Sequence, residues 1–324
     1  MTKTHGRSAA GGTGWVSRIN TQVTLIIAIV VMCAIFTILS PVFLSLKNFI
    51  NIGSYTSIMG VMATGLTLAM FLGGLDISQY SVAAFSGLFT AVLLQHEIPV
   101  GIVIPAVVAI GFAMGAVNSF IITKMKVNPI ITTLGTSLIF RGAAFIMTKG
   151  RYLPIDHRVV NFIGRGRILM IPNVIWIMLI TYAVFFYVLK YTVFGRNIYS
   201  VGGNASASYL SGINVNRVRF FAFAISGMMG AVAGFIMSAQ MGAGLPTAGQ
   251  GSELDVIVAV ILGGVSLTGG KGKILGTLLG VLILGILANG MTLLSVQAYY
   301  QMLIRGLVLV VAVYLDTLRG GGYE

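Results

Sequence analysis

The sequence predicts an all-α polytopic membrane protein with about ten transmembrane helices. Of the 324 residues, 57% are hydrophobic and only 8% are charged, and the mean hydropathy is +0.97. A soluble domain carries about 25% charged residues, because its surface needs them. The 42 glycines suit helices that approach closely inside lipid, and Gly111/Gly115 and Gly276/Gly280 have the GxxxG spacing of such contacts. We therefore expect a single membrane domain.

Ten apolar windows mark the expected helices. A helix needs about 20 apolar residues to cross the hydrocarbon core. The third and eighth windows are short, and glycine pairs interrupt the chain at Gly73-Gly74 and Gly263-Gly264. Transporters place substrate sites at such breaks, because freed backbone groups can line a cavity. The windows cover residues 22–42, 52–72, 80–95, 98–122, 129–147, 173–191, 217–241, 253–268, 274–296 and 298–316.

The first window is expected to be a retained helix. Lys3, Arg7 and Arg18 precede it, but a signal peptide would have a shorter apolar region and a small-residue cleavage site. Residues 1–21 then form an N-terminal tail, residues 22–316 one transmembrane domain, and residues 317–324 a C-terminal tail.

Lysine and arginine predict the orientation, because short cytoplasmic loops are enriched in them. With a cytoplasmic N-terminus, twelve of these residues fall inside and six outside, while Arg141 and Arg305 remain within spans. Both termini and a loop at about 190–217 are then cytoplasmic. The inside residues are Lys3, Arg7, Arg18, Lys124, Lys126, Lys190, Arg196, Arg217, Arg219, Lys271, Lys273 and Arg319, and the outside ones are Lys47, Lys149, Arg151, Arg158, Arg165 and Arg167.

Most of the outside basic residues belong to one loop, at about 148–172. Two interpretations stay open for it. It is either a solvated loop whose charges the orientation bias tolerates, or a basic docking surface that steers an acidic partner.

Several function classes are disfavoured by the sequence. The net charge of +13 does not indicate nucleic-acid binding, because the basic residues lie between apolar segments and are not gathered on one compact domain. The segment from Gly263 to Lys273 departs from a phosphate-binding loop, since Val265 replaces its first glycine and Gly272 its Mg²⁺-binding hydroxyl residue. Cys33 and three histidines form no nucleophile or metal constellation. We expect no catalytic residue, no metal and no cofactor, and any ATP should bind to another subunit.

Four polar residues are candidates for a translocation path or gate: Asp76, Asn118, Glu253 and Asn289. The two acids lie beside glycine-rich breaks, and the two asparagines lie inside spans. An acid at membrane depth is a functional candidate, although Asp76 can instead cap the helix that follows it. A neutral interior rich in amides and hydroxyls suits a polyhydroxylated neutral solute.

An ion-coupled secondary transporter for such a solute, a sugar for example, is one function that the sequence leaves open. Proton-driven carriers usually carry a chain of acids and histidines across the bilayer, but His5, His96 and His157 fall at ends or in loops. A sodium site built from backbone carbonyls would leave no such trace in the sequence.

Specific motifs resemble one family. Residues 192–204 read TVFGRNIYSVGGN and residues 209–215 read YLSGINV, which resembles the cytoplasmic coupling region of permeases for ribose, arabinose, xylose and galactose. From about residue 45 to the end, the chain resembles the permease subunits of bacterial ABC-type monosaccharide importers. The further matching segments are Gly73 to Ser78 (GGLDIS), Thr133 to Thr136 (TLGT) with Arg141-Gly142, Glu253 to Ile257 (ELDVI), Gly263 to Gly272 (GGVSLTGGKG), and Asn289 to Asp316.

The resemblance implies a multi-pass inner-membrane permease that imports a monosaccharide or related polyol by alternating access. Its fold would be the ten-helix type of the vitamin B12 importer's membrane subunit. Its partners would be membrane lipid, a second permease subunit in a homodimer or heterodimer, cytoplasmic ATP-binding subunits and a periplasmic sugar-binding protein. A short helix after Asn204 would seat in the ATPase as a lever. The coupling residues expected there are Gly202, Gly203, Asn204, Ser211 and Gly212.

The chain departs from the family pattern at two places. Ala205 to Tyr209 replaces a run of acids followed by Ala-Ala-Arg, which bears on partner-specific contacts with the ATPase. Gln79-Tyr80-Ser81 replaces Val-Gly-Ser, which changes either the lining of the path or only the packing.

Overall fold

The computed structural model of the chain describes residues 21–320, so the predicted N-terminal tail and the end of the C-terminal tail lie outside the described residues. Within this part, thirteen helices make up nearly all the regular structure. The helices are α1 (Thr21–Leu39), α2 (Leu46–Phe71), α3 (Gln79–Gln95), α4 (Val100–Lys124), α5 (Pro129–Thr148), α6 (Arg158–Arg165), α7 (Asn173–Tyr191), α8 (Val193–Gly203), α9 (Ala205–Leu210), α10 (Val215–Met241), α11 (Glu253–Leu262), α12 (Ile274–Leu293) and α13 (Ala298–Gly320).

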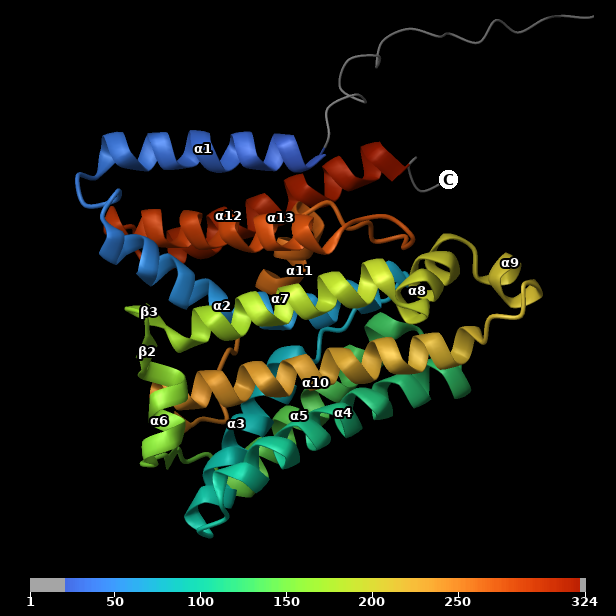
Figure 1. Cartoon of the computed structure of the whole chain (residues 1–324), viewed down its shortest axis with the longest axis horizontal. Coiled ribbons are helices and arrows are strands. Elements are labelled where there is room, and N and C mark those ends of the chain that lie inside the picture. Colours follow the sequence, from blue (N-terminus) through green and yellow to red (C-terminus); the bar gives the residue numbers. More distant parts are fainter. Residues whose placement is uncertain (1–20, 321–324) are drawn as a thin grey trace, which may run out of the picture.

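Two pairs of very short strands join the helices at one end of the bundle. Strand β1 (Leu153–Pro154) pairs antiparallel with β4 (Ala243–Gly244), with Leu153 opposite Gly244. Strand β2 (Arg167–Ile168) pairs antiparallel with β3 (Ile171–Pro172). Figure 1 shows α6, β2 and β3 at one end of the molecule and α8 and α9 at the other. We call these the α6 end and the α9 end.

Each of the ten predicted windows contains a helix, which confirms a mostly helical membrane protein. Among the described residues, seven helices are long and apolar enough to cross a membrane: α1, α2, α4, α5, α7, α10 and α12. Helix α3 has only 17 residues, and the apolar stretch of α13 covers Ala298–Tyr314. Helix α11 has 10 residues, so it rises about 15 Å, which is half of the hydrocarbon core.

Helix α10 runs along one side of α2 and packs mainly against α2, α3 and α4. Helices α2 and α10 are the most buried of the seven, at 83% and 72% of their apolar windows. The GxxxG prediction is confirmed where α4 crosses α10: a Cβ at Gly115 would overlap the Phe223 carbonyl, and one at Gly227 would lie 2.6 Å from the Gly115 nitrogen. The two backbones therefore touch, as in other glycine-mediated membrane contacts.

Candidate functional site

A buried polar network surrounds Asp76 in the turn between α2 and α3. The Asp76 carboxylate accepts hydrogen bonds from the Ser78 amide at 3.1 Å, the Ser78 hydroxyl at 2.6 Å and the Ser226 hydroxyl at 2.6 Å. Asn118 on α4 donates to Ser78 Oγ at 2.8 Å, and Gln79 donates to Ser226 Oγ at 2.9 Å. Asp76 therefore holds the turn before α3 through Ser78, the N-cap residue of that helix, and also links the turn to α10. Asp76 and Asn118, predicted separately, belong to one network.

The departure from the family pattern at residues 79 and 80 has a structural role. Gln79 joins the Asp76 network and also donates to the Met62 carbonyl at 3.0 Å. Tyr80 is 92% buried and its ring fills the space beside Gly249, where any Cβ would overlap it. Gly249 has φ of +66°, a conformation that suits glycine. Two polar atoms of the network, Gln79 Oε1 and Asn118 Oδ1, have no hydrogen-bond partner within the described residues.

The two acids at the start of α11 each pair with an arginine from another helix. Glu253 accepts from Arg141 of α5 at 3.3 Å, and Asp255 accepts from Arg305 of α13 at 3.0 Å. These pairs explain both arginines that the sequence places inside spans, because an unpaired charge is costly there. Glu253 thus lies in an ion pair, apart from the Asp76 network.

Arg141 also holds the loop between β4 and α11. Its guanidinium donates to the Pro246 carbonyl at 3.0 Å and the Ala248 carbonyl at 2.7 Å, in addition to Glu253. One planar fork therefore fixes two turns of the loop and the first residue of α11. The Arg141 side chain is only 11% exposed, so its partners have little access to water.

We expect Arg141→Gln to loosen this loop and to lower the free energy of unfolding by about 1–2 kcal/mol, because two carbonyls and a carboxylate lose their donor. The measurement is hydrogen exchange of the amides at 245–252, which should become at least about ten-fold faster. Arg151→Gln is the control, because Arg151 is exposed and forms no ion pair within the described residues. Unchanged exchange in the Arg141 variant would contradict the clamp.

Asn289 occupies a separate position between α12 and α2. It donates to the Asn48 side chain at 3.0 Å, and Asn48 donates in turn to the Phe43 carbonyl at 3.0 Å. Among the described residues, no hydrogen bond joins this pair to Asp76 or Glu253. The four predicted path residues therefore fall into three places.

Helices α8 and α9 form a protruding unit at the α9 end, and we call it the foot (residues 193–214). Asn204 ends α8 and caps α9 by accepting from the Ala207 amide at 2.9 Å. Gly212 has φ of +82° and turns the chain from α9 toward α10. Ser211 donates to the Ala207 carbonyl at 2.9 Å. These three predicted coupling residues shape the backbone turns of the foot. They offer little side-chain surface for contact with a partner.

Helix α9 of the foot carries two exposed apolar side chains that the residue-level prediction did not select. Tyr209 is 72% exposed and Leu210 is 86% exposed, both on the six-residue helix α9. The motif containing them was visible in the sequence, but their exposure was not. Apolar side chains grouped at the tip of a short protruding helix are typical of a contact surface for a partner.

Backbone contacts connect the foot to the turn that carries Asp76. A Cβ at Gly202 would overlap the Phe71 carbonyl oxygen and lie 2.8 Å from the Gly270 nitrogen. The Gly270 amide itself donates to the Phe71 carbonyl at 2.8 Å. The rings of Tyr199 and Phe71 contact each other in a tilted arrangement, with centroids 4.8 Å apart. Burial raises the pKa of the Tyr199 phenol, which donates to the Gly272 carbonyl at 3.3 Å. The foot, the end of α2 and the 263–272 loop thus form one packed unit.

The basic loop at 148–172 folds at the α6 end, opposite the foot (Figure 1). Lys149, Arg151, Arg158 and Arg167 are exposed. Arg165 instead donates to the Gln240 carbonyl at 2.8 Å and so fastens α6 to α10. Four of the predicted outside charges are therefore exposed, which fits both the solvated loop and the docking surface.

A polytopic helical bundle with broken helices and a buried polar centre is an architecture that membrane transporters use. Comparison with known proteins agrees. A family model described as "Branched-chain amino acid transport system / permease component" matches residues 48–313. The chain belongs to this permease family, and within it to the permease subunits of bacterial ABC-type monosaccharide importers, as the sequence motifs predict.

Three relatives illustrate the similarity. The ribose import permease protein of Haemophilus influenzae is 41% identical over 91% of this chain and 92% of its own length. The ribose import permease protein of Bacillus subtilis is 38% identical over 88% and 89%. The L-arabinose transport system permease protein of Escherichia coli K12 is 37% identical over 89% and 87%. No solved structure matches the chain. The chain is thus a multi-pass inner-membrane permease of a transport system that also contains ATPase and substrate-binding components.

Proposed function

We propose that the chain forms the translocation path of an ATP-driven importer for a monosaccharide or related polyol. The foot is the observation that carries this proposal. Its short helix α9 exposes Tyr209 and Leu210, and backbone contacts at Gly202 join α8 to the end of α2. A rigid element of this kind transmits the motion of an ATPase to the turn that carries Asp76. The names of the ribose and arabinose relatives support a sugar as the substrate.

The foot sets the orientation that we propose for the chain in the membrane, because the ATPase that it contacts is cytoplasmic. The α9 end faces the cytoplasm, which puts both chain termini there, and the α6 end with its basic loop faces the periplasm and a sugar-binding protein. Helices α3, α11 and α13 complete a ten-helix permease of the vitamin B12 importer type, with α11 as a half-span. A second permease subunit, identical or related, completes the path, and the sugar passes between states in which Asp76 and Glu253 have different neighbours.

The test is uptake by proteoliposomes that contain this chain, its ATPase and its binding protein. Labelled ribose, arabinose, xylose and galactose are supplied outside, with ATP enclosed or omitted. We expect uptake of at least one sugar only with ATP and only with all components. Uptake by this chain alone, driven by a sodium or proton gradient, would instead establish the ion-coupled secondary transporter.

The tip of the foot gives a sharper prediction. Replacing both Tyr209 and Leu210 with serine should lower ATP-driven uptake by at least about ten-fold, because apolar contacts of this kind dominate many interfaces. The unfolding midpoint should not change, since both side chains are largely exposed. The control replaces Leu169 and Met170, which are 81% and 80% exposed at the α6 end.

The readout for both pairs is co-purification of the ATPase together with uptake. The Leu169/Met170 control should retain the ATPase. Full retention of the ATPase by the Tyr209/Leu210 variant would show that the foot does not dock to it.

A further inference from the structure

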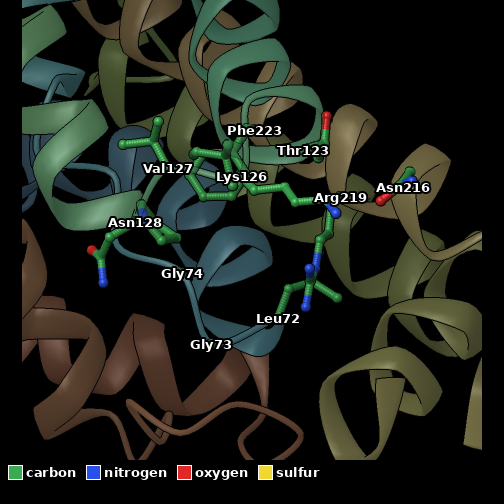
Figure 2. A pocket seen from close by; sticks show the side chains of 12 residues that line it. Leu72, Gly73, Gly74, Thr123, Lys126, Val127, Asn128, Asn216, Arg219 and Phe223 are labelled. Atoms are coloured by element: carbon green, nitrogen blue, oxygen red, sulfur yellow. The ribbon is translucent and has the colours of Figure 1, made fainter. Parts of the chain in front are cut away.

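A polar pocket opens at the α9 end, apart from the Asp76 network and the foot. It has a volume of about 630 Å³ and lies between the end of α2, the α4–α5 connection and the first turns of α10. Figure 2 shows its lining side chains, with Lys126 extending toward Arg219. A volume of this size is in the range of small-molecule sites.

The pocket concentrates positive charge without a carboxylate to balance it. Lys126 comes from the α4–α5 connection and Arg219 from α10, and no acid lines the pocket among the described residues. The ion pairs in this part of the chain are Arg141–Glu253 and Arg305–Asp255. Lys126 and Arg219 thus belong to no ion pair there, and each is available to an anion from outside the chain.

Further donors of the pocket are also available. The Asn216 side chain makes no hydrogen bond within the described residues, and the Asn128 side chain uses only its oxygen, as an acceptor from the Ile130 amide. Four donor groups from two segments of the chain, the α4–α5 connection and α10, therefore line one cavity. An arginine fork and a lysine point charge together match the several acceptor oxygens of a phosphate group.

We infer that this pocket binds a phosphate group, either from an anionic lipid headgroup or from a soluble phosphate ester. A lipid source is compatible with Met125 and Ile130, which flank the pocket and are 62% and 45% exposed. A soluble source is compatible with the cavity volume. In both cases the phosphate bridges Lys126 on one side to Arg219 on the other. It then holds the α4–α5 connection against α10 and against the Leu72–Gly74 turn.

The experiment measures binding to the purified chain in detergent by titration calorimetry. The soluble probes are inorganic phosphate and glycerol 3-phosphate, and the lipid probes are dihexanoyl phosphatidylglycerol and, as the neutral comparison, dihexanoyl phosphatidylcholine. We expect at least one phosphate probe to bind. The double variant Lys126→Gln/Arg219→Gln should weaken that binding by at least about ten-fold, because it removes two charge-assisted contacts.

The matched control is Lys124→Gln/Arg217→Gln. It removes the same charge from the same two segments, but neither residue lines the pocket. We expect its affinity to remain within about three-fold of the unmodified chain. Lys126→Glu alone, at an exposed side chain, is the second variant and should also weaken binding without changing the elution volume.

The outcomes separate the two sources and can overturn the site. Binding of the phosphatidylglycerol probe alone identifies a lipid headgroup, and binding of the soluble probes identifies a phosphate ester. No binding of any probe, or equal weakening in the Lys124/Arg217 control, would exclude the pocket as a phosphate site. Because the assay requires no transport, its result is independent of the proposed importer function.

Discussion

Replacing Gly202 with alanine should destabilise the protein by about 2–3 kcal/mol and lower ATP-driven uptake by at least about ten-fold. A Cβ at this position would overlap the Phe71 carbonyl and approach the Gly270 nitrogen to 2.8 Å. Both are backbone atoms, so no side-chain rotation relieves the contact. The foot must then move away from the end of α2 and lose its connection to the turn that carries Asp76.

Gly203→Ala is the matched control for this prediction, because it makes the same chemical change one residue later. A Cβ at Gly203 meets nothing within 4 Å, and its backbone does not require glycine. Unfolding midpoints in detergent and uptake in proteoliposomes should separate the two variants. Equal behaviour of the two alanine variants would show that the Gly202 contact does not transmit motion.

The helical framework was predictable because lipid demands long apolar segments with internally satisfied backbone groups. The window at 173–191 coincides with α7. The window at 253–268 extends beyond α11 because Val265 and Leu267 are apolar, although they belong to a loop. Helix α11 ends at Leu262, and Gly264, with φ of +84°, turns the chain away from the helix axis. Composition identified the apolar run, and glycine conformation decided how much of it is helical.

The candidate site was predictable only in its local parts. Asp76 and Asn118 could be selected because polar residues are costly inside lipid. Asn118 reaches Asp76 through Ser78, which required α4 to meet the turn before α3. The link to α10 depends on Ser226, which lies 150 residues from Asp76 in sequence and resembles any other small residue of α10. Arg141 and Glu253 were each noted from sequence, but their pairing depends on how α5 and α11 meet.

Asp76→Asn should lower the free energy of unfolding by about 2–3 kcal/mol, because hydrogen bonds to a buried charged group are strong. It should also lower uptake by at least about ten-fold, as the turn between α2 and α3 is then joined less firmly to α10. The carboxylate accepts from two hydroxyls, each at 2.6 Å, and one new amide group would face the Ser226 hydroxyl as a second donor. Asp156→Asn, at an exposed acid of the α6 end, is the control and should change stability by less than about 0.5 kcal/mol.

A double-mutant cycle with Ser226→Ala tests whether Asp76 acts through α10 or only by capping α3. If the network is shared, the loss in the double variant should be smaller than the sum of the single losses by about 0.5–3 kcal/mol. If Asp76 serves only as a cap, Ser226→Ala should have little effect and the two changes should add. The cycle is informative because Gln79 also donates to the Ser226 hydroxyl at 2.9 Å, so one substitution removes both side-chain hydrogen bonds that this hydroxyl makes to Asp76 and Gln79. Additive losses would leave Asp76 as a local cap and would remove the proposed route from the foot to the path.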